Sequence, residues 1–81
     1  MHRESNFTFE ETMNDNEFQF VIDCDVEALV SYLQEDYQLP LSEAFERVYS
    51  SKVFDKLKDR NTGLYLQSPA YIYGFLEEEM N

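Results

Sequence analysis

The sequence predicts an all-α fold, a small bundle of three to four helices preceded by a loose or partly extended N-terminal segment. Three observations support this prediction. A chain of 81 residues holds one small domain, its apolar residues recur at intervals of three or four from Phe18 onward, and two proline junctions divide the rest into shorter helical stretches. We therefore divide the chain into an acidic tail or short strand over residues 1–15 and one helical domain over residues 16–81.

The N-terminal segment contains two phenylalanines, Phe7 and Phe9, followed directly by two glutamates. Alternation over so few residues is a weak strand pattern, and a single strand is not stable alone. The segment could pair with residues 18–20 as a hairpin, or it could be a loose tail. The pattern favours the loose tail.

The first helix is predicted over residues 17–37. Asn16 is its expected N-cap, with Gln19 in the capping-box position three residues on. An alternative makes residues 18–22 a strand and starts the helix after Asp25, but one continuous apolar stripe favours the long helix. The stripe consists of Phe18, Ile22, Val26, Leu29, Val30, Leu33 and Tyr37.

Two short helices should follow Pro40. Ser42 is the expected N-cap of the first, and the pair Ser50-Ser51 is expected to supply that of the second. The apolar positions are Ala44, Phe45, Val48 and Tyr49 in one, and Val53, Phe54 and Leu57 in the other. The pattern leaves open whether they are separate helices or one bent unit.

The last helix is predicted from Pro69 to about Met80, because Ser68 supplies a hydroxyl cap immediately before a proline. Residues 59–63 are expected to form a turn with Gly63 at positive φ, and residues 64–66 an extended segment. The expected apolar side of the last helix is Ile72, Phe75, Leu76 and Met80. Gly74 there indicates either close helix contact or simple tolerance.

Charge is distributed unevenly along the chain. The net charge is -11, from 17 acidic and 6 basic residues. Residues 1–46 alone carry -11, residues 47–60 carry +3, and residues 61–81 carry -3. Such acidity argues against broad binding to nucleic acids or anionic membranes. It also suggests an acidic end that would suit a basic partner, beside a basic stretch that partly neutralises it.

Catalysis, metals and cofactors are not expected. His2 has no histidine or cysteine partner at metal-ligand spacing, and Cys24 lies between two aspartates that disfavour its thiolate. We expect Cys24 to be a small, semi-buried residue. Asp23, Asp25 and Glu27 resemble the start of a calcium loop, but the required glycine is replaced by an alanine. The lone cysteine, and the absence of an apolar leader or an ~18-residue apolar run, predict a cytoplasmic protein without a membrane span.

Two sets of residues are candidates for contacting a partner. Tyrosines are enriched in protein interfaces, and Tyr71 and Tyr73 are too close in sequence to face the same way on a helix. The aromatic set is Tyr65, Tyr71 and Tyr73, with Phe7 and Phe9 of the tail. The basic set is Lys52, Lys56 and Arg60, which could form one ridge.

Residues 18–80 resemble a family of small uncharacterised helical proteins from gut Firmicutes and related bacteria. The resemblance rests on Ala44-Phe45, on Ser51-x-Val53-x-x-x-Leu57, and above all on Thr62-Gly63-Leu64-Tyr65-x-Gln67-Ser68-Pro69-x-Tyr71-Ile72-Tyr73. Some members of this family lie in operons that look like toxin–antitoxin modules. The resemblance implies a cytoplasmic bacterial protein with a partner encoded nearby, and it supplies no catalytic residues.

Together these features predict a non-enzymatic protein–protein interaction module, the antitoxin or regulatory component of a bacterial operon. Its partner would be a protein, a basic one if the acidic end is the contact, and a homodimer is a further expectation. The alternative is a nucleic-acid-associated regulator that uses the basic ridge in residues 47–60 or mimics DNA with its acidic face. A small enzyme is the third and weakest hypothesis.

Overall fold

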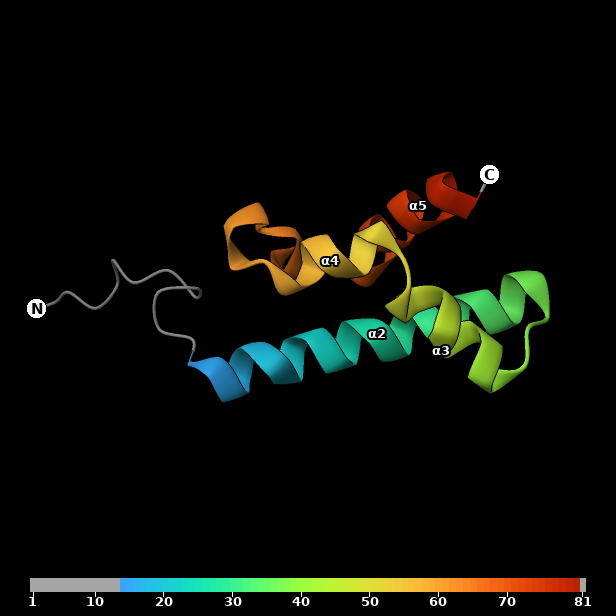
Figure 1. Ribbon diagram of the computed structural model, residues 1–81, viewed down its shortest axis with the longest axis horizontal. Coiled ribbons are helices and arrows are strands. Elements are labelled where there is room, and N and C mark those ends of the chain that lie inside the picture. The colour runs from blue at the N-terminus through green and yellow to red at the C-terminus, as the bar shows by residue number, and fades with distance from the viewer. Residues whose placement is uncertain (1–13, 81) are drawn as a thin grey trace, which may run out of the picture.

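The structure is a computed structural model that describes residues 14–80, and within them all regular structure is helical (Figure 1). This confirms the all-α prediction. Phe7 and Phe9 lie outside the described residues. The elements are α2 (Asp15–Tyr37), α3 (Leu41–Tyr49), α4 (Lys52–Lys58), the short 3₁₀ helices η2 (Arg60–Thr62) and η3 (Leu64–Leu66), and α5 (Pro69–Met80).

Helix α2 begins two residues earlier than predicted. Its N-cap is Asn14, whose side chain accepts a hydrogen bond from the Glu17 amide at 2.8 Å, while Glu17 accepts one from the Asn14 amide at 3.0 Å. This reciprocal capping box satisfies two helix-terminal donors. The predicted cap of Asn16 and Gln19 is therefore wrong, because Asp15 and Asn16 are already helical. The strand alternative for residues 18–22 is wrong as well.

Helices α3 and α4 are separate. Ser42 is not the N-cap of α3, because the helix already starts at Leu41 and follows an extended Pro40. Of the two serines predicted to supply the cap of α4, Ser51 is the N-cap, and Ser50 is the C-cap of α3. The Ser51 hydroxyl accepts from the Phe54 amide at 3.1 Å and donates to the Val48 carbonyl at 2.6 Å. Ser51 therefore bonds to the end of one helix and starts the next.

The segment between α4 and α5 is tighter than predicted. Gly63 has the expected positive φ of 69°, but residues 64–66 form a 3₁₀ turn, closed by the Leu66 amide donating to the Gly63 carbonyl at 3.0 Å. The extended segment predicted there is wrong. Helix α5 starts as predicted, with the Tyr71 amide donating to the Ser68 hydroxyl at 3.3 Å. Gly74 supports no close helix contact, because a Cβ there would meet nothing within 4 Å.

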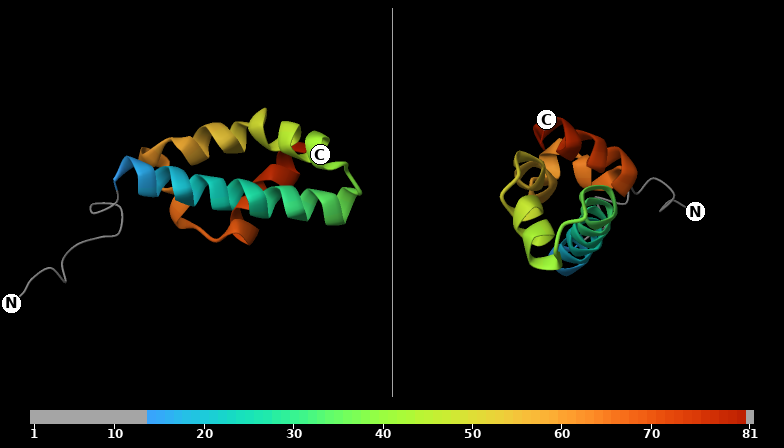
Figure 2. Two further views of the ribbon diagram at one scale, coloured as in Figure 1. Left: turned by 90° about the horizontal axis from the view of Figure 1, so that it is seen from below. Right: turned by 90° about the vertical axis from the view of Figure 1, so that its right-hand side faces the viewer.

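The core lies where α2 is covered by the other helices. The end-on view in Figure 2 shows α2, the α3–α4 pair and α5 arranged around a common centre. The buried apolar side chains are Ile22, Val26, Leu29, Val30, Leu33, Ala44, Val48, Val53, Leu57, Tyr65, Ile72, Tyr73 and Leu76. Six of the seven predicted stripe residues of α2 face this core fully or partly, and Tyr37 is exposed.

The buried face of α5 differs from the predicted one. Ile72 and Leu76 are buried as expected, but Tyr73 takes the core position expected for Phe75, which is 40% exposed. Helix α5 has apolar residues on most sides, so its sequence does not define a single face. The packing against α2 selects the face that contains Tyr73 and leaves Phe75 outside.

Candidate interaction surface

Helix α4 is fixed to α5 by one carboxylate. Glu79 accepts from the amide of Lys52 at 2.9 Å and from the amide of Val53 at 2.7 Å. These amides are unsatisfied donors in the first turn of α4, where the helix dipole also favours negative charge. The contact therefore caps α4 and places its exposed lysines beside the last turns of α5.

A hollow of about 370 Å³ opens between these two helices. Its lining combines two lysines, two glutamates, one threonine and three apolar side chains, namely Lys52, Val53, Lys56, Thr62, Leu64, Phe75, Glu78 and Glu79. We call this the α4–α5 groove. A concave surface that combines apolar side chains with polar and charged groups is typical of a binding site.

A pair of exposed aromatic side chains borders the groove. The Tyr71 and Phe75 rings pack edge to face with their centroids 5.2 Å apart, and the side chains remain 55% and 40% exposed. Phe75 lines the groove on one side, and on its other side it lines a second hollow together with Tyr71 and Gly74. The exposed aromatic pair and the groove therefore form one continuous surface.

The structure brings together three of the predicted contact residues. Lys52 and Lys56 line the groove, and Tyr71 lies beside it. Phe75, which the sequence placed in the core, is the residue that connects them. Its spacing of four from Tyr71 was the available signal, because residues four apart share a helix face.

Tyr65 and Tyr73 are not surface contacts, contrary to the prediction. They are only 3% and 8% exposed. The Tyr65 ring packs edge-on against Phe18 with centroids 4.8 Å apart. The Tyr73 hydroxyl donates to the Asp36 carboxylate at 2.8 Å. Burial, together with this hydrogen bond to Asp36, raises the pKa of Tyr73 well above its ordinary range. Both tyrosines stabilise the packing of their segments on α2.

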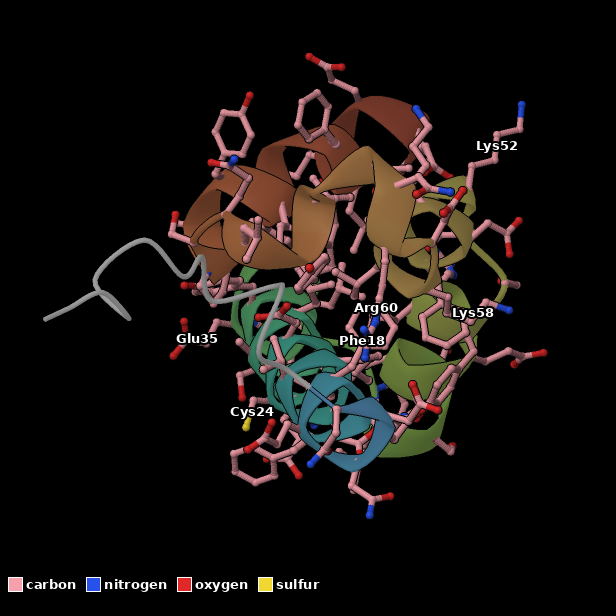
Figure 3. All side chains as sticks on the ribbon, turned by 90° about the vertical axis from the view of Figure 1, so that its left-hand side faces the viewer. Phe18, Cys24, Glu35, Lys52, Lys58 and Arg60 are labelled. Atoms are coloured by element: carbon pink, nitrogen blue, oxygen red, sulfur yellow. The ribbon has the colours of Figure 1, made fainter. Side chains whose placement is uncertain are left out.

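Arg60 does not extend the lysine ridge, which corrects a second prediction. Its guanidinium turns to the start of α2, where it donates to the Asn14 carbonyl at 3.0 Å and lies 3.4 Å from an Asp15 carboxylate oxygen. It also lies over the Phe18 ring, 4.5 Å from the centroid. Figure 3 shows Arg60 stacked on Phe18, with Lys52 pointing away from them. Arg60 thus joins η2 to α2.

The opposite side of α2 is acidic. Figure 3 shows Cys24 and Glu35 on the side of the molecule away from Lys52 and Lys58. Cys24 is exposed, so the prediction of a semi-buried residue is wrong. Asp25 is buried instead, at 6% exposure, and one of its carboxylate oxygens has no hydrogen-bond partner. Burial raises the pKa of Asp25 to about 6.

Within residues 14–80 no group of three or more histidine, cysteine, aspartate or glutamate side chains is placed to hold a metal ion. Among the helices in this part of the chain, none combines the length and the hydropathy needed to cross a bilayer. No protein-family model matches the sequence, and no curated protein or solved structure matches it.

Proposed function

We propose that the protein is a non-enzymatic, cytoplasmic protein-interaction module, the antitoxin or regulatory component of a bacterial operon, and that the α4–α5 groove receives its partner. The observation that supports this most is the exposed Tyr71–Phe75 pair at the edge of a hollow that also contains two lysines. Exposed aromatics that border a concave, partly apolar surface are the usual anchors of protein interfaces.

The alternative function, binding to nucleic acid, needs several cations that face one phosphate backbone. The groove offers Lys52 and Lys56, but Glu78 and Glu79 line the same hollow. The Arg60 guanidinium donates to the Asn14 carbonyl at the start of α2. The Lys58 Nζ lies 3.9 Å from a carboxylate oxygen of Asp55 and over the Phe54 ring. This mixed charge suits a protein partner better than a phosphate backbone.

Affinity capture with the full chain from a native host tests the proposal. We expect one stoichiometric protein partner whose capture falls about tenfold or more in Phe75→Ala, since interface anchors contribute roughly 1–2 kcal/mol or more. The matched control is Phe20→Ala, another exposed phenylalanine (68%), which lies on α2. Equal capture by wild type and Phe75→Ala would show that the groove is not the docking surface.

Nucleic acid is tested separately, by a gel shift at low salt with and without a DNA-binding competitor. We expect neither a shift nor competition. A shift that is lost in the double variant Lys52→Glu/Lys56→Glu, but kept in Lys58→Glu, would replace the proposal with nucleic-acid binding through the groove. Competition without a shift would instead favour DNA mimicry by the acidic side of α2.

A further inference from the structure

We infer that the chain's own residues 7–11, Phe-Thr-Phe-Glu-Glu, occupy the α4–α5 groove and compete there with the partner. The competition rests on the proposed function, whereas the contact itself does not. The inference combines the chemistry of the groove with the position at which the described chain begins.

Two lysines of the groove can pair with the two glutamates of the segment. Lys52 and Lys56 both line the hollow, and within residues 14–80 neither forms an ion pair. The segment ends in two consecutive glutamates and contains no basic residue. Glu78 and Glu79 line the same hollow, but the Glu79 carboxylate is already bound by the amides of Lys52 and Val53. Of the stretches 1–46, 47–60 and 61–81, only residues 47–60 carry a net positive charge, so the two glutamates of the segment gain most from contact with Lys52 and Lys56.

The groove and the segment also both contain apolar side chains. Phe75 is 40% exposed, Leu64 is half-buried, and both line the hollow with Val53. The segment offers two phenylalanine rings immediately before its glutamates. Transferring an aromatic side chain from water to such a surface is favourable, and contact with the Phe75 ring adds to it.

Asn14 lies close enough to the groove for residues 7–11 to reach it. The Asn14 carbonyl accepts a hydrogen bond from Arg60, and Arg60 belongs to η2, whose last residue, Thr62, lines the groove. Phe9 precedes Asn14 by five residues, which span up to about 17 Å when extended. Thr62 follows Arg60 by two positions, a distance of at most about 7 Å along the backbone. A short connection of this kind gives the segment an effective concentration at the groove in the millimolar range.

NMR on the isotope-labelled full chain tests the contact, because a 9.7 kDa protein gives resolved spectra. We expect nuclear Overhauser contacts between the rings of Phe7 or Phe9 and the methyl groups of Val53 or Leu64. In the double variant Phe7→Ala/Phe9→Ala these contacts disappear and the amide signals of Lys52 and Phe75 shift. The control is Phe20→Ala, whose shifts should stay on α2.

Two further measurements make the result decisive. About 1 M salt, which shortens the Debye length to about 3 Å, should reduce the shift difference between wild type and the double variant. A mixture of labelled and unlabelled chains should show no contacts between different molecules. Intermolecular contacts would mean that a second copy fills the groove, and identical groove signals in wild type and double variant would mean that residues 7–11 do not. Either result overturns the inference.

Partner capture separates this inference from the proposed function. If the segment covers the groove in about two thirds of molecules, its removal in Phe7→Ala/Phe9→Ala increases capture about threefold. Capture that depends on Phe75, without the NMR contact, refutes the inference alone. The NMR contact without any partner that depends on Phe75 refutes the proposed function and leaves the intramolecular contact standing.

Discussion

Helices α2 and α4 differ in length and in the source of their N-terminal capping. Helix α2 has 23 residues and is capped by its own neighbours Asn14 and Glu17. Helix α4 has seven residues and receives half of its N-terminal capping from Glu79, which is 26 and 27 residues away from the amides it binds. An isolated helix of seven residues is unstable in water, whereas one of 23 residues exceeds the usual minimum of about 12–15. Helix α4 therefore depends on tertiary contacts, among them the Glu79 cap from α5, more strongly than α2 does.

The comparison extends to the surface. The exposed side of α2 carries acidic residues from its own sequence, and no other element is needed to create it. The α4–α5 groove lies between two helices that are joined by the Glu79 contact and by the core they share. A change that weakens this contact should therefore alter the groove before it alters the core.

The largest effect is expected from Leu29→Ala, which removes a fully buried side chain from the centre of α2. Loss of buried methyl groups and the resulting cavity should lower the free energy of unfolding by about 2–5 kcal/mol. Urea denaturation followed by circular dichroism measures this change. Leu41→Ala, at a position 55% exposed on α3, is the control and should cost less than about 1 kcal/mol. Equal effects would contradict the assignment of the core.

The second effect is a gain in stability, from Asp25→Asn. Burial raises the pKa of Asp25 from 3.8 to about 6. The Asp25 carboxylate therefore binds its proton more tightly in the folded protein than in the unfolded chain. The contribution of Asp25 to stability is therefore most favourable below pH 4 and is lost as the pH rises to about 6. At about 1.4 kcal/mol per pKa unit, the loss at pH 7 approaches roughly 3 kcal/mol.

Unfolding free energies at pH 4 and pH 7 check this prediction. Asp25→Asn should be more stable than wild type at pH 7 and should lose most of the difference between the two pH values. Glu27→Gln, which removes an exposed acid from the same helix, should leave that difference unchanged. A wild type that gains stability between pH 4 and pH 7 would show that Asp25 is not the dominant titrating group.

The third effect tests α4 directly. Glu79→Ala removes a charged acceptor from two amides, so we expect a loss of about 1–2 kcal/mol together with faster hydrogen exchange across α4. Glu78→Ala is the control, since this neighbouring glutamate lines the groove but accepts no such bonds among the described residues. Unchanged exchange in α4 after loss of Glu79 would remove the distinction between the two helices.

The smallest effect is expected at the start of α2. Asn14→Ala removes the local cap and should cost about 1 kcal/mol, while exchange in the middle of α2 stays slow. Asn16→Ala should be nearly neutral, because Asn16 is already helical and exposed. Urea denaturation measures the free energy of unfolding of both variants. A larger loss for Asn16→Ala than for Asn14→Ala would show that Asn16 is the N-cap, as predicted from the sequence.

Particular residues show which structural features could be predicted from the sequence. The apolar spacing of α2, a serine cap for α4, the positive φ of Gly63 and the Ser68–Pro69 helix start were all predicted correctly, and each depends on neighbours within four residues. The candidate surface was predicted less well. Lys52, Lys56 and Tyr71 were named, but Phe75 was assigned to the core and Tyr65, Tyr73 and Arg60 to the surface. Apolar residues lie on most sides of α5, so its sequence did not define which face would be buried.

The sequence by itself determined the all-α class, the long first helix and the start of α5, because periodicity, capping and proline act over a few residues. Only the tertiary structure decided which aromatics are exposed, where Arg60 binds and how α4 is capped. These features depend on which face of α5 packs against α2 and on a carboxylate 26 residues from the amide it binds. No local pattern encodes either of them, because both follow from the way the whole chain fills its core.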